Sequence, residues 1–197
     1  MAKDTKERIL QEALIMFADR GYEGTNMREL AQTLGLGKSA LYKHYASKDE
    51  IWNCLLDEIE SHYSQQFGSG ENQPPAPASC EEFLQMTKGM LNFTMHDPQV
   101  RLARQLLLTE QFRDQRARDL AAEHFLFRFD RIFAPMFASM MEAGLLEQDD
   151  PEMLALEFSS PVSALIMQCD RFPESEDIIV ARMHAYMKRF VQMHKSR

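Results

Sequence analysis

The residues best suited to chemistry in this chain are basic side chains gathered in one short stretch. Lys38, Lys43, His44 and Lys48 fall within 11 positions, and no Asp or Glu occurs from Leu30 to Lys48. A DNA duplex carries about one negative charge per 1.7 Å of its axis. A helix that docks in a DNA groove needs an acid-free basic surface of this kind. The stretch therefore indicates nucleic-acid binding.

The net charge of the whole chain conceals this stretch. The 197 residues include 22 Lys plus Arg and 30 Asp plus Glu, a formal charge of −8. This balance argues against a protein that coats nucleic acid or anionic membranes by bulk charge. Residues 1–53 hold 8 basic and 8 acidic side chains, so residues 54–197 carry the entire −8. The average therefore does not exclude DNA as a partner.

The elements that would position these basic residues are helices. Apolar residues recur at helical spacing along most of the chain, and the alternation typical of strands is absent, so we predict an all-α fold. A first helix spans residues 5–20 and ends at Gly21, and a second begins at a Thr25 cap. A third helix, over residues 38–45, follows the turn at residues 35–37. This pattern is that of a helix-turn-helix in which the third helix reads DNA.

Capping signals place further helices along the rest of the chain. Ser47 and Ser79 are each followed three residues later by Glu, which is the capping-box pattern. A long helix is predicted over residues 113–143. Pro135 and Pro161 fall inside apolar helical patterns, where each should kink or split its helix.

An ordered run of residues near the N-terminus carries a family resemblance. Read along the chain, it comprises Ile9-Leu10-Gln11-Glu12-Ala13-Leu14, Phe17, Gly21-Tyr22, Thr25, Leu30-Ala31, Leu34-Gly35-Leu36, Gly37-Lys38-Ser39-Ala40-Leu41-Tyr42-Lys43-His44-Tyr45 and Lys48. This run resembles the DNA-binding head of the TetR family of bacterial transcriptional regulators and covers about the first 50 residues. The resemblance implies an N-terminal three-helix helix-turn-helix DNA-binding head, residues 1–50. A connecting helix would join it to a larger helical effector-binding and dimerisation body, residues 51–197.

The resemblance also implies which residues meet DNA. The phosphate backbone would be contacted by Thr25, Tyr42, Lys48 and the amides near Gly37 and Lys38. The major groove would be faced by Lys38, Ala40, Tyr42 and His44, with Arg28 approaching from the preceding helix and Ser39 and Lys43 on the same outward surface. Gly37 stands where the family often has Ser, so side-chain capping of the reader helix is lost, and Ser39 stands where Gly is common.

Ordinary structural roles compete with these assignments. An isolated lysine is usually a solvated surface residue, Tyr42 can be packed, and His44 can be a polar surface residue. Within the motif, phosphate contact is favoured for Lys48 and DNA contact for Tyr42 and His44, while Lys43 stays open between the two roles. Ala40 either contacts a thymine methyl group or makes room for the bases.

The body is rich in soft and bulky apolar residues, with 14 Met and 13 Phe in the chain. Apolar stripes are core by default, but this excess, a kink at Pro135 and the family resemblance together predict a pocket for a hydrophobic or amphipathic small molecule. Gln105, Glu110, His124 and Arg128 are its possible polar anchors. The predicted pocket residues are Met86, Met90, Phe93, Leu106, Phe112, His124, Phe125, Arg128, Phe129 and Phe133.

The last two predicted helices carry apolar faces that exceed the evident needs of one monomer. The resemblance implies that these faces form a homodimer through a four-helix arrangement, and two-fold symmetry would require a roughly palindromic operator. The predicted interface residues are Leu154, Phe158, Val162, Leu165, Ile166, Ile179, Met183, Tyr186, Met187 and Phe190.

Several other classes of protein are not supported by the sequence. Three widely spaced cysteines suggest reduced thiols, no secretory signal or membrane span is visible, and no metal site, cofactor or catalytic motif is found. We therefore expect a cytoplasmic, homodimeric, ligand-responsive repressor that binds double-stranded DNA, is not an enzyme and does not bind a membrane. Two alternatives remain: a DNA-binding regulator controlled by a protein partner, and a helical binding protein without DNA-binding activity.

Overall fold

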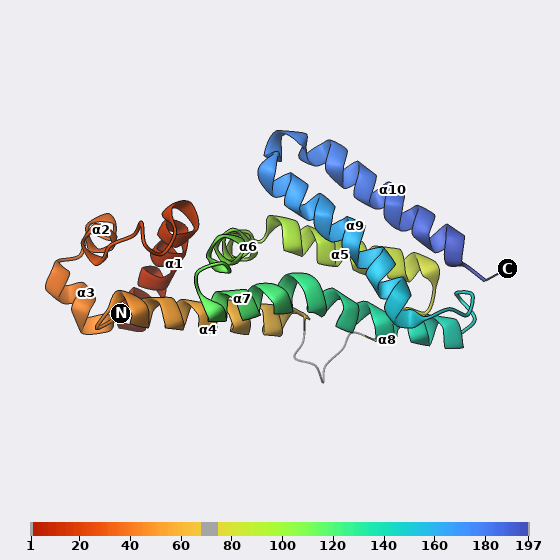
Figure 1. Ribbon diagram of the computed structural model, residues 1–197, viewed down its shortest axis with the longest axis horizontal. Coiled ribbons are helices and arrows are strands. Elements are labelled where there is room, and N and C mark those ends of the chain that lie inside the picture. Colours follow the sequence, from red (N-terminus) through yellow and green to blue (C-terminus); the bar gives the residue numbers. More distant parts are fainter. Residues whose placement is uncertain (1, 68–74, 197) are drawn as a thin grey trace. The chain divides into compact units, whose positions relative to one another are not determined.

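The computed structural model describes residues 2–67 and 75–196, and within these ranges the chain is built from helices (Figure 1). The only β pairing in the described ranges is an isolated bridge between Leu146 and Lys195. The all-α prediction is confirmed. The helices are α1 (Ala2–Arg20), α2 (Met27–Thr33), α3 (Lys38–His44), α4 (Lys48–Phe67), α5 (Cys80–His96), α6 (Pro98–Glu110), α7 (Gln115–Ala122), a π-helix (Glu123–Phe127), α8 (Arg128–Glu142), α9 (Pro151–Arg171), a 3-10 turn (Pro173–Ser175) and α10 (Glu176–His194).

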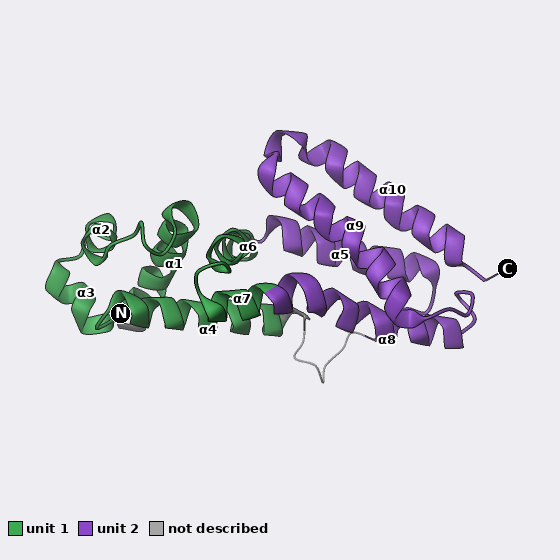
Figure 2. Ribbon diagram, viewed as in Figure 1, with its two compact units in different colours: residues 1–67, 98–121 green, residues 68–97, 122–197 purple. Residues whose placement is uncertain are grey.

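The chain divides into two compact units (Figure 2). Unit 1 comprises residues 1–67 and 98–121, and unit 2 comprises residues 68–97 and 122–197. This division by packing differs from the predicted division at residue 50, because α6 packs against α1 and α4 and so joins the first unit. A functional boundary at residue 50 stays a prediction.

Unit 1 is held together by an apolar core to which each of its first four helices contributes. Fully buried side chains include Phe17 on α1, Leu30 on α2, Leu41 on α3 and Leu55 on α4. A cluster of Phe17, Tyr22 and Trp52 adds edge-on and tilted ring contacts, with centroids 5.2 to 5.7 Å apart. The core thus holds α3 by one face and leaves its other face outside.

The helix ends follow the predicted capping chemistry with one exception. The amide of Glu50 donates to Ser47 Oγ (3.1 Å), and the amide of Ala46 donates to the Glu50 carboxylate (2.6 Å), so this capping box is confirmed. The cap of α2 is wrong in the prediction: Asn26, not Thr25, accepts the amides of the first turn. Asn and Thr are both common caps and differ little, but Asn ranks higher, so the predicted cap was the weaker of the two neighbours.

Unit 2 has a core of aromatic rings that meet mostly edge-on or tilted. Phe158 of α9 lies 4.8 to 5.7 Å, between ring centroids, from Phe83, Phe133, Phe137 and Phe190, which come from α5, α8 and α10. The long helical stretch predicted over residues 113–143 is confirmed as a continuous run over residues 115–142. It contains a π turn between α7 and α8 that was not predicted, because the apolar spacing runs on through that turn and does not mark it.

Of the two expected effects of Pro135 and Pro161, a kink or a split, the split is absent, because α8 and α9 each continue through their proline. A proline leaves the carbonyl four residues earlier without its helical donor. For Pro161 this is the carbonyl of Glu157, which accepts a hydrogen bond from the Tyr186 hydroxyl of α10. For Pro135 the earlier residue, Arg131, is exposed, so water can reach its backbone.

Candidate nucleic-acid interface

The outward face of α3 carries the predicted DNA-facing residues. Leu41 is buried in unit 1, whereas Lys38, Ser39 and Lys43 are exposed and Tyr42 is 41% exposed. Ala40 and His44 are half-buried. A seven-residue helix anchored by one buried leucine therefore presents a basic, polar surface to its surroundings.

The start of α3 has the backbone of a cap without a capping side chain. Gly37 has extended φ and ψ of −69° and 147°, and its carbonyl accepts the amides of Ala40 (2.9 Å) and Leu41 (3.2 Å). No side-chain cap bond forms at this end. The expected loss of side-chain capping at Gly37 is confirmed.

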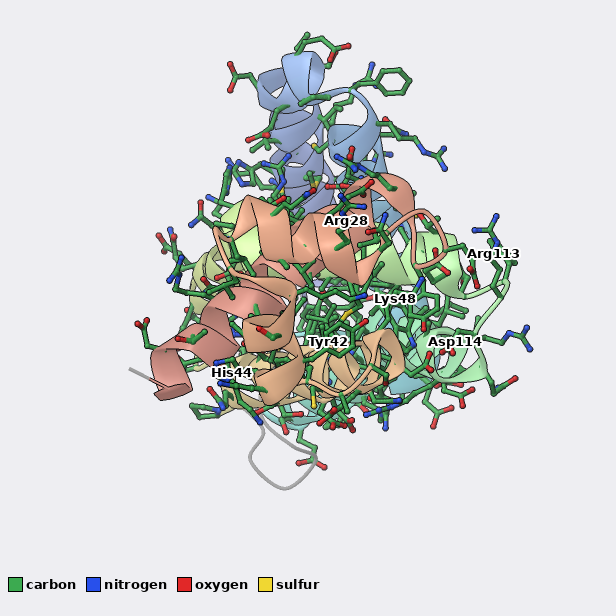
Figure 3. All side chains as sticks on the ribbon, turned by 90° about the vertical axis from the view of Figure 1, so that its left-hand side faces the viewer. Arg28, Tyr42, His44, Lys48, Arg113 and Asp114 are labelled. Carbon is green, nitrogen blue, oxygen red and sulfur yellow. The ribbon has the colours of Figure 1, made fainter. Side chains whose placement is uncertain are left out.

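Tyr42 is not packed into the core, which was the competing structural role. Lys38 Nζ lies 5.7 Å from the centroid of the Tyr42 ring, a cation–π contact on the surface of α3. Figure 3 shows Tyr42 and His44 with Arg28 and Lys48 on the side of unit 1 that faces the viewer. Arg28 is exposed on the first turn of α2.

Lys48 has a structural role that the sequence did not reveal. Its ammonium donates to the backbone carbonyls of Tyr22 (2.9 Å) and Thr25 (3.0 Å) and lies 4.0 Å from the centroid of the Tyr22 ring. An ammonium has three N–H donors. The two carbonyls occupy two of these donors.

The assignment of Thr25 as a phosphate contact is contradicted by its burial. The residue is 2% exposed, and its hydroxyl donates to the carbonyls of Gly21 (3.1 Å) and Met16 (3.2 Å). These bonds tie the end of α1 to the start of α2. Its side chain is structural, and its carbonyl helps to hold Lys48.

The predicted pocket residues do not converge on one cavity. Met90, Phe129 and Phe133 line a cavity of about 20 Å³ in unit 2, together with Phe158 and Thr87. This volume holds about one water molecule and is far below the ~300 Å³ of a small-molecule pocket. The described structure therefore shows a closed apolar core with a small defect.

Of the other predicted pocket residues, two lie in unit 1. Leu106 is in the core of that unit, and Phe112 is wrong as a pocket residue, because it is 78% exposed in the turn after α6. The remaining five lie in unit 2: His124 is buried, and Met86, Phe93, Phe125 and Arg128 are half-buried.

His124 is the one buried histidine of the π-helix. Burial, with the nearby positive charges of Arg128 and Arg131, lowers the pKa of His124 from 6.5 to about 3. The imidazole is therefore neutral at physiological pH. It can act there only as a neutral hydrogen-bonding group.

The predicted dimer residues are mostly core residues of their own chain. Phe158, Met183 and Phe190 are among those buried within unit 2, so they are wrong as an exposed interface. The same holds for Leu154, Val162, Ile166, Ile179 and Met187, while Leu165 and Tyr186 are half-buried. A stripe of apolar residues on a helix does not say whether its partner is the same chain or another.

The exposed apolar side chains of these helices lie at other positions, which the sequence reading missed. Ile178 at the start of α10 is 64% exposed, and Leu156 on α9 is 48% exposed. Ala181 and Ala185 continue the exposed face of α10 at helical spacing. The further large exposed residues here are Met153, Met167, Phe172 and Met193.

The described residues form neither a membrane-spanning helix nor a cluster of metal ligands. No helix among residues 2–67 and 75–196 is long and apolar enough to cross a membrane. In the same ranges, no group of three or more His, Cys, Asp or Glu side chains is placed to hold a metal ion.

The N-terminal residues of unit 1 are similar in sequence to known DNA-binding regulators. Residues 9–53 match a family model described as bacterial regulatory proteins, tetR family. The negative transcriptional regulator IcaR of the icaADBC biofilm operon from Staphylococcus epidermidis is 34% identical over 58 residues, which are 29% of this chain and 31% of that protein. The chain thus matches about a third of the length of this relative.

Solved structures share the fold over nearly the whole chain. A TetR family transcriptional regulator from Pseudomonas syringae is 19% identical, with a TM-score of 0.66 and coverage of 99% of each chain. A protein from Saccharomonospora viridis, in complex with choline, is 20% identical, with a TM-score of 0.71 and coverage of 99% of this chain and 100% of the other. At these identities the likeness concerns the fold. Residues 9–53 are thus similar to the tetR family of bacterial regulatory proteins, and the chain as a whole has the fold of solved TetR family regulators.

Proposed function

We propose that this protein is a homodimeric transcriptional repressor that binds a palindromic operator and is released by a hydrophobic or amphipathic small molecule. We place its action in the cytoplasm. The observation that carries the DNA-binding part is the outward face of α3, where Lys38, Ser39, Tyr42 and Lys43 are exposed without an acidic residue among them. Repression is supported by the relative IcaR, which is named as a negative regulator.

Lys48 provides the first test of DNA binding. Replacing it with Ala removes one phosphate contact from each subunit of the dimer, and the slope of log affinity against log salt should fall by about 1.8. The loss should be similar for all sequences, because a phosphate contact carries no base information. Fluorescence anisotropy with duplexes selected from a random library measures both quantities. An unchanged slope would show that Lys48 is only structural.

The proposed effector site is the small cavity lined by Met90, Phe129 and Phe133. A drug-sized ligand must enlarge it, and the flexible Met90 side chain and the adjoining π-helix are features that favour such a change. The choline bound by the Saccharomonospora viridis protein supports a small organic effector for this fold.

Filling the cavity tests this site. Met90→Phe should abolish the thermal shift produced by an effector found in a compound screen, while operator affinity stays within about threefold. Leu84→Phe, on the same helix and outside the cavity lining, is the control. If Met90→Phe keeps the full ligand response, the effector binds elsewhere.

For the homodimer we propose the exposed face of α9 and α10, with Leu156, Met167, Ile178 and Ala185, as the interface. Ile178→Asp should convert the dimer to a monomer in light scattering, because it places a charge in an apolar contact. A variant that stays dimeric at micromolar concentration would exclude this face.

Control by a protein partner is the alternative, and the closed cavity of about 20 Å³ is the observation that favours it. Purified protein that binds its operator but responds to no small molecule, and is released by a protein from the same cells, would support this alternative.

A further inference from the structure

The carboxylate of Glu110, at the C-terminal end of α6, is buried in unit 1. The residue is 2% exposed, and its Oε1 accepts a hydrogen bond of 3.1 Å from the backbone amide of Tyr22, 88 positions earlier in the chain. A buried carboxylate is costly unless it is paired with donors or positive charge. Here the Tyr22 amide supplies a donor and Arg113 Nη1, 3.9 Å from Oε1, supplies charge. Glu110 thus holds the turn between α1 and α2.

A second side chain of α6 contacts the chain just before this turn. Gln105 Nε2 donates to the carbonyl of Ala18 (2.9 Å), which lies in the last turn of α1, where carbonyls lack helical donors. Between these two anchors, Gly21 has a φ of 75°, and a Cβ atom there would lie 2.8 Å from Glu110 Oε1. The turn is therefore shaped to receive the carboxylate.

Tyr22 connects this turn to the start of α4. Its carbonyl accepts from Lys48 Nζ, its ring lies under the same ammonium, and its hydroxyl donates to Asp49. Its ring centroid is also 5.2 Å from that of Trp52, the single tryptophan of the chain. Figure 3 shows Arg113, which follows α6, on the same view of unit 1 as Lys48.

We propose that Glu110 is a positioning residue for DNA binding: by holding the Tyr22 turn, it places the Lys48 ammonium where it meets a DNA phosphate. The proposal rests on the proposed DNA-binding function. Glu110 itself touches no DNA in this account. It acts through one backbone hydrogen bond and through the tyrosine that lies between it and Lys48.

The variants Glu110→Ala and Glu110→Gln separate this role from a general effect on folding. The alanine removes the acceptor of the Tyr22 amide, while the glutamine retains a carbonyl oxygen at the same distance. Glu110→Ala should weaken operator binding about tenfold and lower the salt slope by about 1.8, as loss of one phosphate contact in each subunit of the dimer does. Glu110→Gln should keep the affinity within about threefold of that of the unaltered protein and leave the salt slope unchanged. Thr109→Ala, exposed on α6 one residue away, should change neither.

A double-variant cycle tests the route through Lys48. If Glu110 acts through Lys48, Glu110→Ala combined with Lys48→Met should bind no more weakly than Lys48→Met alone. If the losses of operator affinity caused by Glu110→Ala and Lys48→Met multiply in the double variant, the proposal is wrong. It is also wrong if Glu110→Ala leaves the salt slope unchanged. Circular dichroism checks the fold of each variant. If Glu110→Ala is unfolded, Glu110→Asp, which keeps the charge but draws the oxygen back, takes its place with the same expectations.

Trp52 emission separates failure of this inference from failure of the proposed function. Glu110→Ala should shift the emission of Trp52 in the absence of DNA, because the Tyr22 ring moves, and Glu110→Gln should not. If the unaltered protein binds no duplex in the library, the proposed function is wrong, and the emission still decides whether Glu110 holds the turn. If the unaltered protein binds DNA and Glu110→Ala has the same emission and affinity, the inference is wrong.

Discussion

The outward face of α3 was predicted from polar residues, whereas that of the α9–α10 pair was predicted from apolar residues. The predicted α3 residues are largely exposed, but most of the predicted α9 and α10 residues are buried. On α3, the residues predicted to face outward from their polar character include the exposed Lys38, Ser39 and Tyr42. On α9 and α10, residues predicted to face a second subunit, among them Phe158 and Met183, are buried in their own chain. Charge marks an outward surface because a buried, unpaired charge is costly. Apolar character marks only burial, which one chain can satisfy alone.

The sharpest test of this difference is Phe158→Ala. Its ring contacts five others, so we expect a loss of about 3 to 5 kcal/mol in the free energy of unfolding, measured in urea. Phe127→Ala, which removes an exposed ring of the same unit, should cost less than about 1 kcal/mol. If Phe158→Ala instead dissociated a dimer and left stability unchanged, the apolar stripe would be an interface after all.

In unit 1, Gly21→Ala tests whether the close approach of Glu110, in addition to the positive φ, requires a glycine in this turn. A positive φ costs an alanine about 1 kcal/mol, and the contact with Glu110 Oε1 should raise the total to about 2 kcal/mol. Gly35→Ala is the matched control, with a φ of 68° and no atom within 4 Å of the added carbon. If Gly21→Ala and Gly35→Ala lose the same stability in thermal melts, the Glu110 carboxylate can move away from the added carbon at little cost.

The free energy of unfolding of the two units should also depend differently on pH in the acid range. In unit 2, His124 stays neutral because its pKa is lowered to about 3, whereas in an unfolded chain it takes a proton near pH 6.5. Its contribution to stability is therefore complete above pH 6.5 and falls, by up to about 1.4 kcal/mol per pH unit, as the pH drops toward 3. His124→Gln should flatten the dependence of the unfolding free energy on pH in this range. A slope equal to that of the unaltered protein would contradict the assignment.

Unit 1 should respond in the opposite direction through Glu58 on α4. Burial and the nearby carboxylate of Glu7 raise the pKa of Glu58, while His62 partly lowers it. A carboxyl with a raised folded pKa favours the folded state at low pH and loses that contribution as the pH rises through its folded pKa. Glu58→Gln should therefore stabilise the protein at pH 7 relative to pH 4. If Glu58→Gln changes the free energy of unfolding equally at pH 4 and pH 7, the pKa of Glu58 is not raised in the folded protein.

The smallest expected effect concerns Ala40 on the reader face. Ala40→Ser should change the ranking of operator sequences by about 1 kcal/mol or less and leave the salt slope unchanged, since it alters a base contact and no phosphate contact. Binding to a library of duplexes measures the ranking. A uniform loss across all sequences would place Ala40 against the backbone instead.

Much of the fold and part of the site follow from local chemistry. The capping boxes at Ser47 and Ser79, the turn at Gly21 and the helical period of each segment are local patterns, and they are present as predicted. The cap at Asn26, the π turn at residues 123–127 and the continuous helix through Pro161 were not predictable in this way. Each depends on small differences in free energy between neighbouring residues, or on a distant donor such as the Tyr186 hydroxyl.

The sequence by itself determined that the chain is helical, that its reader helix is basic and which residues of that helix lie opposite Leu41. These properties arise from spacing and side-chain chemistry within a few turns. Only the tertiary structure decided that Lys48 and Thr25 bind backbone carbonyls, that α6 belongs with the first four helices, and that Glu110 reaches the Tyr22 amide. Such contacts join residues up to 88 positions apart. They depend on how packed helices meet in space, which no local pattern encodes.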